Sequence, residues 1–115
     1  MEHVWTASEV VRECYRRTRR PARYRWNVTA RMCRDASRNL RAALTEYAGL
    51  DEVAPTVMFA AVAADDCAWR LERRPHRQDW KALCHRMLAH ASFALERRIP
   101  GAKASHSIGG RGREA

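Results

Sequence analysis

Four cysteines, Cys14, Cys33, Cys67 and Cys84, carry the most distinctive chemistry of this 115-residue chain. Their spacings of 19, 34 and 17 residues match no compact C-x-x-C zinc or redox motif. Each falls on the apolar stripe of a different predicted helix, so all four thiols could meet in one core. Four converging thiolates would suit a tetrahedral zinc ion or an iron–sulfur cluster. The alternative, which we favour from the sequence, is that each cysteine is a small buried hydrophobic residue and that the protein has no cofactor.

The turns between the helices decide whether these thiols can lie at one level. Cys67 and Cys84 lie eight and nine residues from a turn centred at residue 75. Cys33 and Cys67 also differ by only one residue in their distances from a turn centred at residue 49.5. One residue corresponds to about 1.5 Å along a helix axis. Cys14 joins the layer only if the first connection is centred near residue 23.5, as a helix capped by Asn27 implies. A tight turn at Pro21 would leave Cys14 about six residues, roughly 9 Å, out of level.

The elements that position the cysteines are four segments with helical periodicity, divided by proline and glycine. Short connections make consecutive helices antiparallel, so we predict an all-α, up-down-up-down four-helix bundle. Residues 101–115 are polar and glycine-rich, which predicts a flexible, disordered basic tail after a single helical domain at residues 1–100. The expected helices cover residues 7–19, 22–48, 52–74 and 77–99. Sequence patterns place each helix boundary to within about two to four residues.

Cap signals and apolar stripes set these boundaries. Thr6 and Glu9 form a T-x-x-E capping box, Pro21 or Asn27 opens the second helix, and Asp51 caps the third. The stripe of the third helix keeps the four-three spacing of a bundle seam. The predicted inward residues are Val4, Ala7, Val11, Cys14 and Thr18; Cys33, Ala36, Leu40, Leu44 and Tyr47; Val53, Val57, Ala60, Ala64, Cys67 and Leu71; and Trp80, Leu83, Cys84, Met87, Leu88, Ala91, Ala94 and Leu95.

The charge of the chain points to a polyanionic partner. The net charge is +9, and 20 of the 22 basic residues are arginine, whose planar guanidinium binds phosphate in a bidentate manner. Arginines crowd the first interhelical region, interleaved with Tyr15, Tyr24 and Trp26, and a further arginine stripe follows the second helix. This pattern predicts nucleic-acid contact; the alternative is the ordinary solvated face of amphipathic helices. The predicted interface consists of Arg12, Arg16, Arg17, Arg19, Arg20, Arg23, Arg25, Trp26, Arg31, Arg34, Arg38 and Arg41.

A second apolar stripe on the third helix indicates another kind of partner. Met58, Val62 and Trp69, with Asp65 among them, lie on roughly the opposite side from the bundle seam. Such a face suits a protein partner or a homodimer, with Asp65 pairing with an arginine across the contact. The alternative is a third helix packed more centrally than a simple bundle assumes.

The remaining function classes find little support in the sequence. The chain contains no Gly-rich phosphate loop, no H-E-x-x-H and no recognisable nucleophile context, so we expect no catalytic activity. It has no apolar run of the roughly 20 residues that a membrane span needs, and no signal-peptide pattern. We therefore expect a cytoplasmic, non-enzymatic accessory or regulatory protein that contacts nucleic acid; the interaction module that uses the third helix is the alternative.

Overall fold

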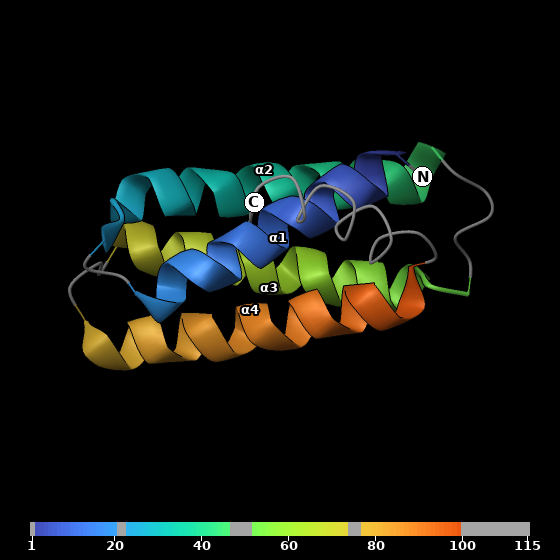
Figure 1. The fold of residues 1–115 in the computed structure, drawn as a ribbon. Coiled ribbons are helices and arrows are strands. Elements are labelled where there is room, and N and C mark those ends of the chain that lie inside the picture. The colour runs from blue at the N-terminus through green and yellow to red at the C-terminus, as the bar shows by residue number, and fades with distance from the viewer. Residues whose placement is uncertain (1, 21–22, 47–51, 74–76, 100–115) are drawn as a thin grey trace, which may run out of the picture.

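The protein folds as four α-helices, and no strand occurs in the described part of the chain. The computed structural model describes residues 2–20, 23–46, 52–73 and 77–99. The helices are α1 (Glu2–Arg19), α2 (Trp26–Glu46), α3 (Ala54–Arg73) and α4 (Gln78–Arg98). Figure 1 shows α2, α3 and α4 running back and forth alongside one another, with α1 inclined across them. The all-α four-helix bundle of up-down-up-down topology is confirmed.

The bundle is a closed ring of neighbours in which α1 packs on α2, α2 on α3, α3 on α4, and α4 on α1. Consecutive helices are antiparallel, so α1 and α3 finish at the same end of the bundle where α2 and α4 begin (Figure 1). We call this the arginine end. None of the described helices is long and apolar enough to cross a membrane.

The core is built from the predicted stripes and is rich in small side chains. Alanine and cysteine supply most of its buried residues on α3, where Ala61, Ala63 and Ala68 are buried in addition to the predicted seam. Small residues let helix backbones approach closely, so α3 packs on α2 and α4 over a wide face. Leu40, Leu88 and Leu95 are the largest of the fully buried side chains.

The predicted start of the first helix was wrong. The helix α1 begins at Glu2, so Thr6 and Glu9 lie inside it and do not form a capping box. Val4 is fully buried against the core, and the burial of an aliphatic side chain stabilises by about 1.5–3 kcal/mol. That gain exceeds the roughly 1 kcal/mol of a cap, which explains why the helix continues past the local signal.

The second helix begins at Trp26, four residues later than the predicted start at residue 22. Of the two predicted starts, Pro21 and an Asn27 cap, the observed one is closer to the second, but Asn27 lies inside the helix and does not cap it. The other observed bounds lie within two residues of the predicted ones, apart from the end of α2, where Tyr47 lies outside the described residues, as do Asp51 and the predicted tail at residues 101–115.

Candidate functional site

The first part of the site is the connection between α1 and α2. Arg16, Arg17 and Arg19 occupy the last turn of α1, where positive charge is favoured by the helix dipole. Beyond it, the backbone N–H of Arg23 donates to the carbonyl of Arg20 at 3.0 Å.

Two aromatic side chains of this connection are accessible. Tyr24 is 37% and Trp26 is 39% exposed. The guanidinium of Arg17 lies over the Tyr24 ring, 4.7 Å from its centroid. Basic and aromatic groups therefore meet here as the sequence predicted.

The second part of the site comes from the end of α3 and the start of α4, which the sequence reasoning missed. Arg70 and Arg73 lie in the last turn of α3, and Trp80 and Lys81 lie in the beginning of α4. The antiparallel topology brings them to the arginine end, beside the first connection (Figure 1). The sequence does carry a signal for these residues. Aromatic residues and arginines occur together near both connections, and the predicted antiparallel topology puts the two connections at the same end of the bundle.

The aromatic rings of this second part are surrounded by cations. The Trp69 and Trp80 ring centroids are 5.9 Å apart. Arg73 lies over Trp69 at 4.6 Å, and Arg70 and Arg77 lie over Trp80 at 5.1 and 5.2 Å. These contacts hold the rings and the cations together. Arg70 and Arg77 are also paired with Asp66 and Asp79, at 2.8 and 2.7 Å, so of these three arginines Arg73 alone has no acidic partner within the described residues.

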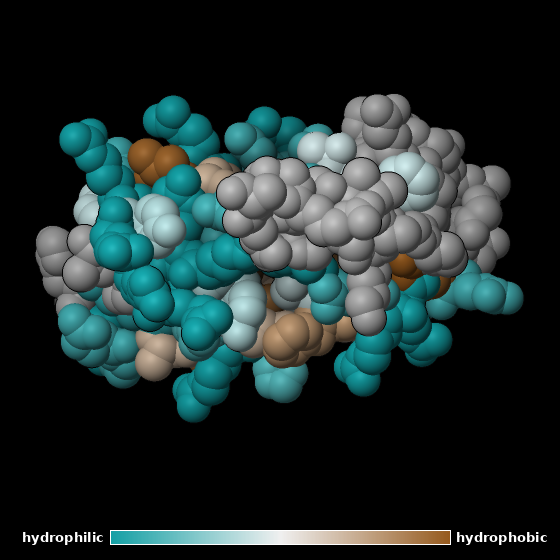
Figure 2. Space-filling view, viewed as in Figure 1, coloured by the Kyte–Doolittle hydropathy of each residue, from teal (hydrophilic) through white to brown (hydrophobic). Residues whose placement is uncertain are grey.

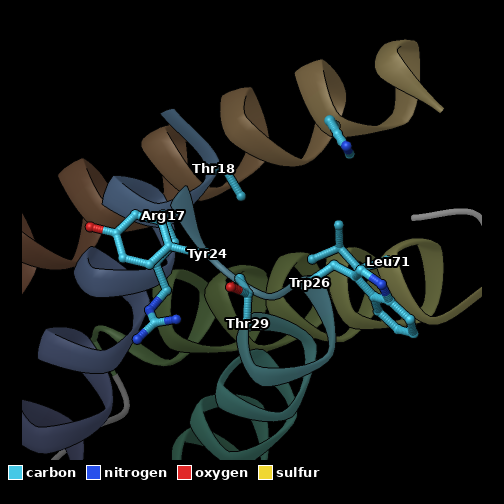
Figure 3. A pocket seen from close by; sticks show the side chains of 7 residues that line it. Arg17, Thr18, Tyr24, Trp26, Thr29 and Leu71 are labelled. Carbon is cyan, nitrogen blue, oxygen red and sulfur yellow. The ribbon is translucent and has the colours of Figure 1, made fainter. Parts of the chain in front are cut away.

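A pocket of about 200 Å³ lies at the arginine end between the two parts. Its walls come from all four helices and the first connection, and Figure 3 shows Tyr24 beside Arg17, with Trp26 and Leu71 close together across the opening. Lys81 of α4 also lines it. The pocket combines apolar rings and a leucine with two cationic side chains, a combination that suits a flat aromatic group attached to an anion.

Several of the predicted interface arginines are held in ion pairs within the bundle. The pairs Arg34–Glu72 and Arg34–Asp65 join α2 to α3, as does Arg41–Asp65 at 3.2 Å. Hydrogen bonding to Glu72 raises the pKa of Arg34, and the same contact lowers the pKa of Glu72. The remaining pairs of predicted interface residues are Arg12–Glu96, Arg16–Glu13, Arg17–Glu13 and Arg38–Asp35.

The other predicted arginines have no such pair in the described part of the chain. Within the described residues, no acidic side chain lies within ion-pair distance of Arg19, Arg20, Arg23, Arg25 or Arg31. All five side chains are exposed. In Figure 2 hydrophilic side chains dominate the left-hand end of the visible face, which is the arginine end, and hydrophobic atoms there form only small separate areas. Among the predicted interface residues, the arginines without an acidic partner therefore lie at the arginine end and do not extend along the whole of α2.

The predicted partner stripe on α3 is divided by the tertiary structure. Met58 and Val62 are exposed, at 41% and 50%. Asp65 is engaged by α2 arginines of the same chain, and Trp69 belongs to the aromatic group of the arginine end. Arg41 also reaches the Met58 sulfur at 3.7 Å.

All four cysteines are fully buried and unbridged. The Cys14 thiol donates to the Thr29 carbonyl at 3.9 Å, and the Cys67 and Cys84 thiols each donate to the carbonyl of the other residue, at 3.6 and 3.8 Å. The neighbouring Cys14 thiol and then burial raise the pKa of Cys33. The residue counts from the turns predicted one level for Cys33, Cys67 and Cys84, and left Cys14 dependent on the first connection. Within the described ranges, no three or more histidine, cysteine, aspartate or glutamate side chains are arranged to hold one metal ion.

Comparison with known protein families, with curated proteins and with solved structures gives no significant match for this chain.

Proposed function

We propose that this protein is a small non-enzymatic nucleic-acid-binding protein that uses the arginine end of its bundle as the contact surface, in an accessory or regulatory role. One observation carries the proposal: the fold gathers free arginines and four aromatic rings from two separate connections at one end. Guanidinium groups neutralise phosphates, and accessible rings stack on bases.

The ring geometry favours single-stranded nucleic acid over duplex. Bases are available for stacking only when they are unpaired, and stacking on an aromatic side chain contributes about 1–3 kcal/mol per base. The pocket lined by Tyr24, Trp26 and Lys81 is large enough for one base, and Arg17 and Lys81 in its lining supply the positive charge that a phosphate needs. We place the protein in the cytoplasm as part of the same proposal, since unbridged thiols persist there.

The test is binding of labelled single strand and duplex of equal length, measured by fluorescence anisotropy over a salt series. The variant R20A/R23A/R25A removes three arginines that lack acidic partners. If all three contact phosphates, the slope of log K against log salt falls by about 2, since each single-strand contact contributes about 0.7. A fourfold rise in salt then weakens the wild type about 20-fold more than the variant.

A matched control is R86A/R97A/R98A, which removes the same charge from exposed positions in the middle and the last turn of α4. We expect its slope to stay close to that of the wild type. Equal reductions in the two triple variants would show that net charge alone is being measured, and an absence of binding at low salt would refute the proposal.

A second candidate function is protein association through α3. Met58, Phe59 and Val62 are 41–50% exposed on that helix, and an exposed apolar face is typical of a partner or homodimer contact. This alternative predicts a molar mass above the monomer in light scattering, nearly independent of salt and reduced in M58A/V62A. A monomeric wild type that captures no partner through this face would remove the alternative.

A further inference from the structure

A second pocket lies at the arginine end, where the last turn of α1 faces the beginning of α4. Its volume is about 300 Å³, and its described lining consists of Thr18, Arg19, Gln78, Lys81, Ala82 and His85. We call it the cationic pocket, and we call the pocket that holds Tyr24 and Trp26 the aromatic pocket. Thr18 and Lys81 line both of them. The two pockets therefore meet at these side chains, and one ligand can extend from one pocket into the other.

The cationic pocket offers hydrogen-bond donors without a competing acid. Within the described residues, neither Arg19 nor Lys81 forms an ion pair with an acidic side chain. Gln78 adds an amide donor, and no carboxylate belongs to the described lining. Asp79, the next residue in the chain, is paired with Arg77 at 2.7 Å. Cationic donors form their strongest hydrogen bonds with anionic oxygens, so these side chains suit an anion.

The third basic side chain of this pocket, His85, is held in one orientation by α1. The Thr18 hydroxyl donates its only hydrogen to the Tyr15 carbonyl at 2.9 Å. Toward His85 Nδ1, 3.1 Å away, the same oxygen can therefore only accept, so Nδ1 carries a hydrogen. The imidazole also stacks on the Tyr15 ring, with the centroids 4.8 Å apart. Nε2 has no hydrogen-bond partner among the described residues, and it is the ring nitrogen left to share a proton with a ligand oxygen.

The two pockets together select a particular kind of ligand. Tyr24 and Trp26 suit a flat ring in the aromatic pocket (Figure 3). A phosphate monoester carries a charge of about −1.5 to −2 at neutral pH and three strong acceptor oxygens, whereas each phosphodiester within a strand carries one negative charge. Arg19, Lys81 and His85 supply three separate basic groups. These groups match the monoester better than the diester in both charge and number of acceptors.

We propose that the two pockets form one site for a nucleotide that carries a phosphate monoester, with the base in the aromatic pocket and the phosphate in the cationic pocket. In a single strand only a phosphorylated end has such a group, so the site distinguishes strand ends from internal positions. The inference rests on the proposed nucleic-acid contact, which supplies the strand. A free mononucleotide offers the same chemistry, and the test below distinguishes the two sources.

The test compares three labelled single strands of one sequence by fluorescence anisotropy, with a 5′-phosphate, with a 3′-phosphate, and with hydroxyl groups at both ends. We expect one of the phosphorylated strands to bind about 10- to 150-fold more tightly than the hydroxyl strand, as charge-assisted hydrogen bonds imply. R19A/K81A should remove most of this advantage. R97A/R98A, which removes the same charge from the last turn of α4, should keep it.

His85→Ala should reduce the advantage of the phosphorylated strand by about 2- to 13-fold, the contribution of one hydrogen bond. This variant also loses the stacking on Tyr15, so circular dichroism is used to check that it folds. R19A/K81A leaves that stacking in place and tests the same pocket independently. An unchanged advantage in folded R19A/K81A would overturn the inference.

Competition with adenosine monophosphate, adenosine and inorganic phosphate identifies the source of the ligand. Adenosine monophosphate that displaces the phosphorylated strand should do so better than either of the others, because only it fills both pockets. An affinity equal to that of the strand would assign the site to free nucleotides, and a weaker one to strand ends; both support the shared chemistry. Inorganic phosphate that competes equally well would overturn the inference.

Failure of the inference and failure of the proposed function give different results. If all three strands bind equally, the inference is overturned while the proposed nucleic-acid contact stands. If none of them binds at low salt, both are refuted together.

Discussion

The participation of the second connection in binding is the prediction that depends most directly on the tertiary structure. The variant R73A/R77A removes two exposed guanidinium groups at the end of α3 and just before α4. Neither belongs to the interface predicted from the sequence, which ended at Arg41. Arg73 lies over Trp69 at 4.6 Å, and Arg77 pairs with Asp79 at 2.7 Å. Both interactions are at the surface, so removing them should leave the fold intact.

The magnitude follows from counterion release. If Arg73 and Arg77 each neutralise one phosphate of a single strand, their removal lowers the slope of log K against log salt by about 1.4. A fourfold rise in salt therefore weakens the wild type about sevenfold more than R73A/R77A. This effect should add to that of R20A/R23A/R25A, since the two sets of arginines lie on different helix ends and share no partner.

Fluorescence anisotropy with a labelled single strand at several salt concentrations gives the slope. The control is R97A/R98A, which removes two arginines from the last turn of α4, at the opposite end of the bundle. A slope for R73A/R77A equal to that of the wild type would show that the second connection does not touch nucleic acid. The idea of one composite surface would then be untenable, even if the first connection still bound.

Three further predictions concern stacking, packing and pH. Trp26→Ala should weaken single-strand binding by about 1–3 kcal/mol, or roughly 5- to 150-fold, without changing the salt slope; a changed slope with intact affinity would contradict a stacking role. Leu40→Ala, at a fully buried position, should lower the free energy of unfolding in urea by about 2–5 kcal/mol, and a decrease of less than about 1 kcal/mol would contradict its place in the core. The pKa of Glu72 is lowered in the folded state by its hydrogen bond with Arg34, so this pair stabilises the fold above the unfolded pKa of about 4.3 and stops doing so as the pH falls through the lower folded value. Because the pair is exposed to solvent, Glu72→Gln should lower the free energy of unfolding by no more than about 1 kcal/mol near neutral pH, and by almost nothing in strong acid, below the folded pKa of Glu72. An equal decrease under both conditions would exclude the ion pair as the cause.

The sequence predicted the secondary structure and the core well because both depend on periodic burial. The seam from Val57 to Leu71 on α3 is buried as expected. Apolar residues at four-three spacing share one face of a helix, and that face packs into the core. Local cap chemistry was a weaker guide. The capping box at Thr6 was overridden because burial of Val4 outweighs a cap.

The thiol layer was predictable only in part. Counting residues from the turns placed Cys33, Cys67 and Cys84 at one level, and left Cys14 dependent on where α2 begins. In the structure the Cys14 thiol lies against the Thr29 carbonyl of α2. The backbone carbonyl that each thiol contacts could not be read from the sequence, because it depends on side-chain directions set by the packing of neighbouring helices.

By itself, the sequence determined that this chain forms four antiparallel helices with an excess of arginine and one buried cysteine per helix, because composition and periodicity are local properties. The tertiary structure decided which charges remain available. It paired Arg34 and Arg41 with acids of α3, and it joined the aromatic rings of two distant connections at one end. Those outcomes depend on which helices are neighbours and on how each is rotated, and residues far apart in the chain meet only once the bundle has formed.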